Sequence, residues 1–266
     1  MNAGTHPQPI LSARGIVNRF GKQEVHDHVS LDVLPGEILG IAGGSGSGKS
    51  VLLKTLIGLH HPDRGDVRIN GTPVEKIGEA EKAALIGVLF QQGALFSSLS
   101  VAQNIMLPMR QHTRLPEQQQ ERVAAMKLEL TGLPAESGIK FPYQLSGGMV
   151  KRAAFARALA LDPRILFLDE PTSDLDPLTA SGIDSLIGQL NRSLGITVVV
   201  VTHDLTTLFT VCHRVAVLVD GKVIVDRMDK LMDSDQPWIH EFFSGPRGQA
   251  AKHGAMSARK RRHGNG

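Results

Sequence analysis

The chain has 266 residues and a mass of 28.7 kDa, a length that fits one large domain or two modest ones. Apolar residues make up 41% and charged residues 21%, which excludes collagen-like and largely disordered chains and predicts a folded, soluble protein. The single cysteine, Cys212, can form no internal disulfide, so folding should not depend on an oxidising compartment.

The formal net charge of +3 comes from the end of the chain. From residue 247 onward there are six Lys and Arg and no Asp or Glu; removing these six from the 29 Lys and Arg leaves 23 against 26 Asp and Glu. A mildly acidic body argues against a nucleic-acid-binding domain. The basic tail is interpreted as a solvated terminus, with contact to RNA or anionic lipid as the alternative.

Neither a signal peptide nor a membrane span is expected. Residues 1–9 lack a basic stretch followed by an apolar one, and apolar runs such as 196–201 are much shorter than the roughly 18 residues needed to cross a bilayer. Any membrane role is therefore expected to come through partners, and the chain is expected to be cytoplasmic.

The first 90 residues predict strands around one helix. The run 10–33 has a β-like pattern broken by Gly21, and a glycine-rich loop at 43–48 opens into a predicted helix that ends near Gly58. A strand, a glycine loop and a helix therefore follow one another. The predicted strands of this part lie at 10–33, 38–42, 67–70 and 86–90.

Residues 101–161 change to helical periodicity, with a polar interruption at 114–122. This part, about residues 93–161, is interpreted as an inserted helical subdomain. Later β-rich runs are nearly all apolar, as expected for parallel strands covered on both faces, so the core is predicted to be α/β. These later strands are predicted at 165–168, 196–201 and 215–219.

The segment between the strand at 38–42 and the helix fits the P-loop pattern G-x-x-x-x-G-K-[ST]. Its glycines let backbone N–H groups converge on phosphate oxygens, and the helix N-terminus adds its dipole. Lys49 is expected to reach the β- and γ-phosphates and Ser50 to bind Mg²⁺; a flexible Gly/Ser turn, the alternative, would not explain this pair. The predicted phosphate-binding residues are Gly43, Gly44, Ser45, Gly46, Ser47, Gly48, Lys49, Ser50 and Val51.

The apolar strand at 165–168 ends in two carboxylates, Asp169 and Glu170. Successive strand residues face opposite ways, so one acid can address Mg²⁺ while the other points toward an attacking water. Asp169 is assigned to the metal and Glu170 to the general base. The alternative, a plain polar strand end, is disfavoured by the P-loop upstream.

With the run Leu145-Ser146-Gly147-Gly148-Met149 added to these motifs, the chain resembles the ATP-binding subunits of ABC transporters over roughly residues 10–225. The resemblance implies a P-loop NTPase (ABC ATPase) core with an N-terminal antiparallel β subdomain and an inserted α-helical subdomain. It also implies hydrolysis of ATP to ADP and phosphate with Mg²⁺. By resemblance, Phe20 is the adenine-stacking aromatic, Gln91 the Q-loop glutamine with catalytic and metal-binding roles, Asp176 the D-loop acid and His203 the switch histidine.

In that family, two copies enclose two ATP molecules. Ser146, Gly147 and Gly148 of one copy bind the γ-phosphate of ATP held by the other, so the resemblance implies an ATP-dependent homodimer. Asp174 stands where the D-loop often has alanine, which puts the transfer of D-loop communication in doubt. Two smaller departures are Gly44, where proline is frequent, and Met149, where glutamine is common.

Stretches outside the nucleotide motifs resemble the ATPases of Mla-type phospholipid transporters. This similarity implies an MlaE-like permease, an MCE-domain protein and a small STAS-domain subunit as partners. It also implies phospholipid as cargo, a role in outer-membrane lipid asymmetry, and a peripheral position on the cytoplasmic face of the inner membrane. The matching stretches lie at 90–96, 107–116, 126–129 and 145–152.

The sequence is divided into a flexible N-terminus (1–9), the ATPase domain (10–235) and a C-terminal extension with a basic, disordered tail (236–266). Within the extension, Trp238 with Phe242 and Ile239 with Phe243 have helical i,i+4 spacing. These side chains are expected to be covered, and docking on their own body is one interpretation. In Mla-type ATPases a C-terminal extension instead reaches the opposite subunit, so the resemblance leads to the hypothesis that this extension supports the dimer.

Other functions stay open at this point. An ABC ATPase for a different cargo, or a non-transport ABC ATPase of translation or DNA maintenance, would share the nucleotide motifs. Translation types usually carry two ATPase domains, and DNA-maintenance types split theirs with long coiled coils, whereas this chain has one compact set of motifs. A P-loop kinase or GTPase would leave the run 145–149 unexplained.

Overall fold

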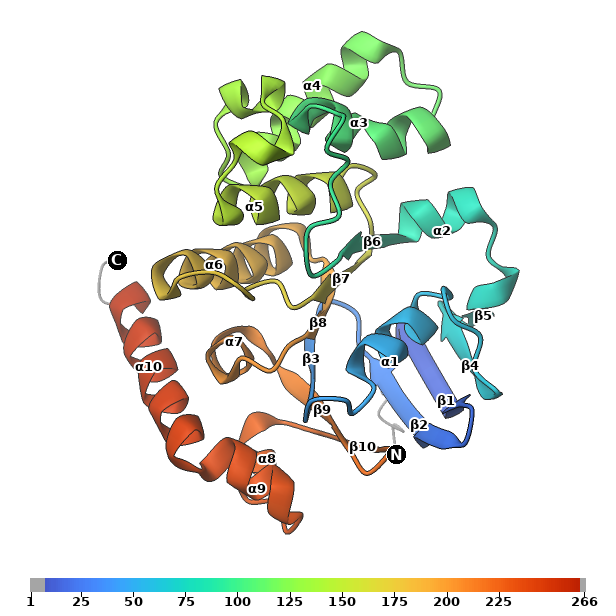
Figure 1. Ribbon diagram of the computed structural model, residues 1–266, viewed down its shortest axis with the longest axis vertical. Helices are drawn as coiled ribbons and strands as arrows, with labels where there is room; N and C mark the ends of the chain where they lie inside the picture. Colours follow the sequence, from blue (N-terminus) through green and yellow to red (C-terminus); the bar gives the residue numbers. More distant parts are fainter. Residues whose placement is uncertain (1–7, 264–266) are drawn as a thin grey trace, which may run out of the picture. The chain divides into compact units, whose positions relative to one another are not determined.

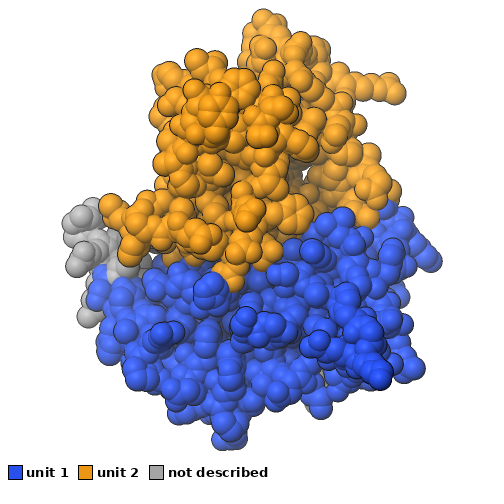
Figure 2. Space-filling view, in the orientation of Figure 1, with its two compact units in different colours: residues 1–77, 197–266 blue, residues 78–196 orange. Residues whose placement is uncertain are grey.

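The computed structural model describes residues 8–263, and for the last helix it describes side chains through residue 257. Most of the predicted flexible N-terminus and residues 264–266 of the predicted disordered tail lie outside the described residues. The chain forms two units, residues 1–77 with 197–266 and residues 78–196, which Figure 2 colours separately. Each unit is described by itself, and the domain boundaries drawn from the sequence stay predictions.

The first unit contains an antiparallel sheet with strand order β2-β1-β4-β5 (Figure 1). Leu11 pairs with Val33 on one side and with Ile69 on the other, and all three side chains are buried. This sheet is the predicted N-terminal antiparallel β subdomain. Its elements are β1 (Leu11–Phe20), β2 (Gln23–Val33), β4 (Arg64–Ile69), β5 (Thr72–Pro73) and the short 3-10 helix η1 (Val74–Lys76).

The first unit also contains a second group of paired strands, most of them parallel. Strand β3 pairs in parallel with β8 and β9, and β10 pairs antiparallel with β9. Every residue of β3 and β8 is buried, which explains their continuous apolar sequences. The elements here are β3 (Ile38–Gly43), α1 (Lys49–Leu56), β8 (Thr197–Val201), α7 (Leu205–Val211), β9 (Arg214–Val219) and β10 (Lys222–Asp226).

Three helices, α8 (Met228–Met232), α9 (Pro237–Ser244) and α10 (Pro246–His263), complete the first unit. Helix α10 stands where the sequence predicts a disordered tail. It packs on α7, buries Ala255, and brings Gly248 so close to Phe243 that a Cβ on Gly248 would lie 2.0 Å from the Phe243 carbonyl oxygen. The sequence did not indicate this helix, because it is rich in basic residues and packs through small residues instead of a stripe of large apolar ones.

Helix α9 settles where the C-terminal aromatics dock. Ile239 and Phe243 are fully buried on their own unit, and the Phe243 ring meets that of Phe209 on α7 edge-on at 6.3 Å between centroids. The Trp238 ring stacks on Phe242 at 4.8 Å. Ile239 and Phe243 therefore dock on the chain's own body, and support of a dimer by the extension stays a prediction.

The second unit consists of two parallel strands and a helical insertion. Strands β6 and β7 pair in parallel, and helices α3, α4 and α5 share a core that includes Ile105, Leu128 and Ala153. This confirms the inserted helical subdomain. The elements are α2 (Glu79–Leu85), β6 (Ile86–Leu89), α3 (Val101–His112), α4 (Glu117–Leu130), η2 (Ala135–Ile139), η3 (Pro142–Gln144), α5 (Gly147–Ala158), β7 (Ile165–Asp169) and α6 (Pro177–Leu194).

Across residues 8–263, none of the helices combines the length and apolar character that crossing a membrane requires.

Candidate functional site

The glycine-rich loop runs from the end of β3 to the start of α1, in the predicted order of strand, loop and helix (Figure 1). Gly46 and Gly48 have φ angles of +76° and +92°, which L side chains rarely adopt. A Cβ on Gly48 would lie 2.4 Å from Val25 Cγ1 and 2.7 Å from His26 Nε2. Glycine is therefore required at Gly48 by both conformation and space.

Lys49 begins α1 and folds back over the loop. Its Nζ donates to the carbonyl oxygens of Gly43 at 3.0 Å and Gly44 at 2.9 Å. Ser45 and Ser50 are exposed. The loop thus presents an ammonium group and hydroxyls at the N-terminus of a helix, an arrangement that suits an anion.

His203 lies at the same edge of the sheet as this loop. Val201 of β8 pairs with Ile41 of β3, and Thr202 N donates to Ile41 O at 3.1 Å. Since the two strands are parallel, their carboxyl ends meet there, and the residues that follow them face a common region. His203 is exposed at that edge, just before α7 begins.

Phe20 ends β1 and is 49% exposed, which leaves much of its ring open to a ligand. On the covered part, its ring stacks on His60, with centroids 5.4 Å apart and an interplanar angle of 20°. The sequence does not indicate this pair, because the two residues stand 40 positions apart in the chain. Together the exposed Phe20 and the half-buried His60 form an aromatic pair in the unit that holds the P-loop.

The predicted acidic residues and Gln91 belong to the second unit. Leu89 of β6 pairs with Leu168 of β7, so Gln91, just after β6, and Asp169 and Glu170, at the end of β7, lie at adjacent ends of two parallel strands. Both acids are largely buried, at 9% exposure each. Glu170 has a φ of +47°, a left-handed conformation that is uncommon for a residue other than glycine.

Lys151, on α5, connects these two strand ends. Its Nζ donates to the carbonyl oxygen of Gln91 and to that of Glu170, the latter at 3.1 Å. Burial lowers the pKa of Lys151, while Asp174, Glu170 and then Asp169 act in the opposite direction. The sequence did not indicate this contact, because Gln91 lies 60 positions from Lys151 in the chain.

The run 145–149 forms the start of α5. Ser146 is the N-cap residue, and its Oγ accepts a hydrogen bond from Met149 N at 3.3 Å. Ser146 and Gly147 are exposed, whereas a Cβ on Gly148 would lie 2.4 Å from Thr179 Cγ2. The helix therefore turns an open, positively polarised end toward its surroundings.

Asp176 caps α6 in the same unit. Its Oδ1 accepts from the backbone N–H groups of Leu178 and Thr179, each at 3.0 Å. Hydrogen bonds from Thr179, chiefly from its side chain, hold the pKa of Asp176 below its ordinary value. This residue has a clear local role as a helix cap.

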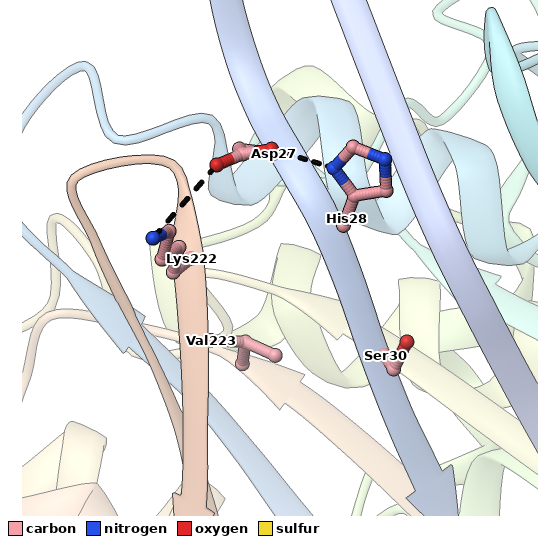
Figure 3. A pocket seen from close by; sticks show the side chains of 5 residues that line it. All are labelled: Asp27, His28, Ser30, Lys222 and Val223. Atoms are coloured by element: carbon pink, nitrogen blue, oxygen red, sulfur yellow. Dashed lines mark hydrogen bonds and ion pairs between the residues drawn. The ribbon is translucent and has the colours of Figure 1, made fainter.

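A hollow of about 430 Å³ beside β2 and β10 contains none of the predicted site residues (Figure 3). Asp27 lies there between His28 Nδ1, at 2.6 Å, and Lys222 Nζ, at 4.0 Å. The hydrogen bond from His28 lowers the pKa of Asp27. In the described residues no cluster of three His, Cys, Asp or Glu suits a metal ion, either here or elsewhere.

Comparisons with known proteins place the chain in a family. A family model described as ABC transporter matches residues 26–173. The probable ribonucleotide transport ATP-binding protein mkl of Mycobacterium leprae is 38% identical over 241 residues, which cover 89% of this chain and 69% of that protein. The intermembrane phospholipid transport system ATP-binding protein MlaF of Haemophilus influenzae is 35% identical over 242 residues, covering 90% and 91%.

Another relative has a different named cargo. The methionine import ATP-binding protein MetN of Caulobacter vibrioides is 44% identical over 199 residues, covering 74% of this chain and 59% of that protein. Among solved structures, the dimeric post-hydrolysis state of the ATP-binding cassette MJ0796 bound to ADP and Pi has a TM-score of 0.74 and 32% identity. It covers 82% of this chain and 98% of that chain.

The fold and the P-loop, together with these likenesses, define an ATP-binding cassette ATPase. The chain belongs to the ABC transporter family, and it is similar to MlaF within that family. Both the family and the P-loop ABC ATPase fold predicted from the sequence are confirmed. The chain is thus the ATP-hydrolysing subunit of an ABC transporter.

Proposed function

We propose that this subunit drives phospholipid transport through a membrane permease. The observation that carries the proposal is the match to MlaF, which spans nine-tenths of both chains. The MetN match is higher in identity but leaves 41% of that protein uncovered, so it supports the shared ATPase more than a shared cargo. The ribonucleotide cargo in the name of mkl is the second candidate.

For ATP binding, we assign the phosphates to the P-loop. Backbone N–H groups from Gly43 to Val51 would bind phosphate oxygens, with Lys49 on the β- and γ-phosphates. The exposed Phe20 ring would stack on adenine, an interaction worth about 1–3 kcal/mol per base. The support is the open ring of Phe20 and the glycine loop with left-handed backbone angles, both within one unit.

Mg²⁺ fits the chemistry of the residues assigned to it. The Ser50 hydroxyl, the Gln91 side-chain amide oxygen and the Asp169 carboxylate are oxygen donors, the type of ligand that Mg²⁺ prefers. When bound, the ion would neutralise charge on the phosphates. Glu170 would take the proton of the attacking water, and His203 would hydrogen-bond the γ-phosphate.

The proposed active form is a homodimer. Ser146, Gly147 and Gly148 at the open start of α5 would donate to the γ-phosphate of ATP on the partner copy, and Asp176 would lie near the interface. One helix terminus stabilises an anion by only about 0.3–1 kcal/mol at an exposed site, so closure must sum many such donors. Hydrolysis removes the γ-phosphate and with it those bonds.

The partners are proposed on the resemblance of the sequence to Mla-type ATPases. An MlaE-like permease would receive the ATPase, and an MCE-domain protein and a STAS-domain subunit would complete the transporter. The chain would be peripheral, on the cytoplasmic face of the inner membrane, where it would support outer-membrane lipid asymmetry.

Affinity purification of the tagged full chain from its native cells, in mild detergent, tests the cargo. We expect a permease to co-purify and glycerophospholipid to stimulate ATP hydrolysis by the complex. A Lys49→Ala chain is the control: it should recover the same partners without stimulated hydrolysis. Stimulation by methionine or ribonucleotides, with none by phospholipid, would contradict the proposal.

A further inference from the structure

Lys151 is a buried cation between two loops, the one that follows β6 and the one that follows β7. It lies on α5, and only 5% of the residue is exposed. Its Nζ donates to Gln91 O, to Glu170 O at 3.1 Å and to Ser173 Oγ at 3.4 Å. A lysine ammonium has three protons, so these contacts account for all of its donors.

The bond to Glu170 acts on a strained backbone. Glu170 is in the left-handed region with a φ of +47°, a conformation that persists only where the surroundings over-determine it. Its carbonyl oxygen accepts from Lys151 and also from Ser173, through Oγ at 2.9 Å and N at 3.2 Å. This backbone turn sets the direction in which the Glu170 side chain leaves the end of β7.

The charge of Lys151 is balanced within the same unit. Asp174 exerts the largest electrostatic effect on Lys151 among its acidic neighbours, ahead of Glu170 and Asp169. Asp174 also has a left-handed backbone, with a φ of +61°. A buried cation without nearby opposite charge is strongly destabilising, so the exposed acid Asp174 and the two acids at the end of β7 help to keep Lys151 charged.

We infer that Lys151 is a positioning residue for ATP hydrolysis, holding the backbones of Gln91 and Glu170 so that the Glu170 carboxylate stays where it can activate water. The inference rests on the proposed role of Glu170 as general base. Because Lys151 acts through Glu170, its loss should lower kcat and leave the KM for ATP nearly unchanged.

The test is steady-state ATP hydrolysis by the purified full chain. Lys151→Met removes the hydrogen-bond donors but keeps a side chain of similar length. It should lower kcat about 10- to 100-fold and leave KM within about threefold of the parent value. Lys127→Met is the matched control, because Lys127 is also a buried lysine of this unit, paired with Asp162 on another surface. Its kcat should stay within about twofold of the parent, since it contacts neither Gln91 nor Glu170.

Two further variants keep the inference testable if Lys151→Met fails to fold. Lys151→Gln retains one donor group, and Ser173→Ala removes one of the bonds to the Glu170 carbonyl. Each should lower kcat by a smaller factor, about three- to tenfold. In a Glu170→Gln background, Lys151→Met should have no additional effect, because both changes remove the same function.

The outcomes separate this inference from the proposed function. If Glu170→Gln is inactive while Lys151→Met keeps kcat within twofold, or raises only KM, the positioning role is wrong and the general base stands. If Glu170→Gln hydrolyses ATP at the parent rate, the general base assignment fails, and the positioning role fails with it.

Discussion

At the residue scale, the P-loop rests on a buried polar group that nucleotide chemistry does not require. Asn18 Nδ2 donates to His26 Nδ1 at 2.9 Å and to Thr55 Oγ1 at 3.0 Å, and all three residues are buried. Since an amide N–H group only donates, Nδ1 accepts and the proton of His26 is on Nε2, on the side of Gly48. Burial lowers the pKa of His26 to about 4, opposed by the Gly48 backbone and aided by His60.

This pKa predicts how the free energy of unfolding depends on pH. The pKa of His26 in the unfolded chain is near 6.5. Between that pH and about pH 4, the unfolded state therefore binds a proton on His26 that the folded state does not bind. Stability is therefore full above about pH 6.5 and falls as the pH drops toward 4, by about 3 kcal/mol in total. Urea unfolding of the parent and of His26→Gln across pH 4–7.5 measures this loss of unfolding free energy.

His26→Gln keeps an acceptor for Asn18 but does not titrate. Its unfolding free energy should fall less over this range than that of the parent, and the difference isolates His26 from the other histidines. Parallel curves for the two proteins would show that His26 does not set this pH dependence.

The individual site residues differ in how well the sequence alone indicates them. The P-loop, the acids after β7 and the start of α5 are local patterns, so their residue types and spacing were sufficient to place them on their elements. Lys151 and His60 were not, because each makes its key contact with a distant segment: Lys151 with Gln91, 60 residues away, and His60 with Phe20. The site roles themselves stay predictions.

At the scale of elements, helix α9 is held by two buried anchors. Ile239 and Phe243 are fully buried, and Trp238 lies beside the P-loop, 3.8 Å from the position of a Cβ on Gly44. The sequence indicated this helix through its i,i+4 pairs but could not choose its docking surface. It missed β10 and α10, because β10 alternates between half-buried and exposed residues and α10 has no apolar stripe.

Removal of α9 should therefore destabilise the fold. Full burial of an Ile or Phe side chain contributes about 1.5–3 kcal/mol, so truncation after Asp235 should cost about 3–6 kcal/mol. Thermal or urea unfolding measures this loss of stability. Truncation after Gly245, which removes only α10, is the comparison. An unchanged midpoint after Asp235, combined with loss of dimerisation, would contradict this account and assign α9 to dimer support instead.

At the scale of the whole molecule, the two units divide the assigned roles. The first holds the P-loop, Phe20 and His203, and the second holds Gln91, the two acids and the start of α5. The helical insertion was predictable because its helices follow one another in the sequence, whereas the antiparallel β subdomain, whose strands are separated by β3 and α1, was predicted from the family resemblance. In the proposed homodimer, the exposed Ser146 and Gly147 would meet nucleotide on the second copy, since their helix end is open.

The most direct test of this dimer is the mass of the Glu170→Gln chain in solution, by sedimentation velocity or light scattering, with and without MgATP. We predict a monomer without nucleotide and, with MgATP, a doubled mass that retains two ATP molecules per dimer. Ser146→Arg in the same background should bind ATP and stay monomeric. Tight ATP binding by the Glu170→Gln chain with no increase in mass at any protein concentration would contradict the account.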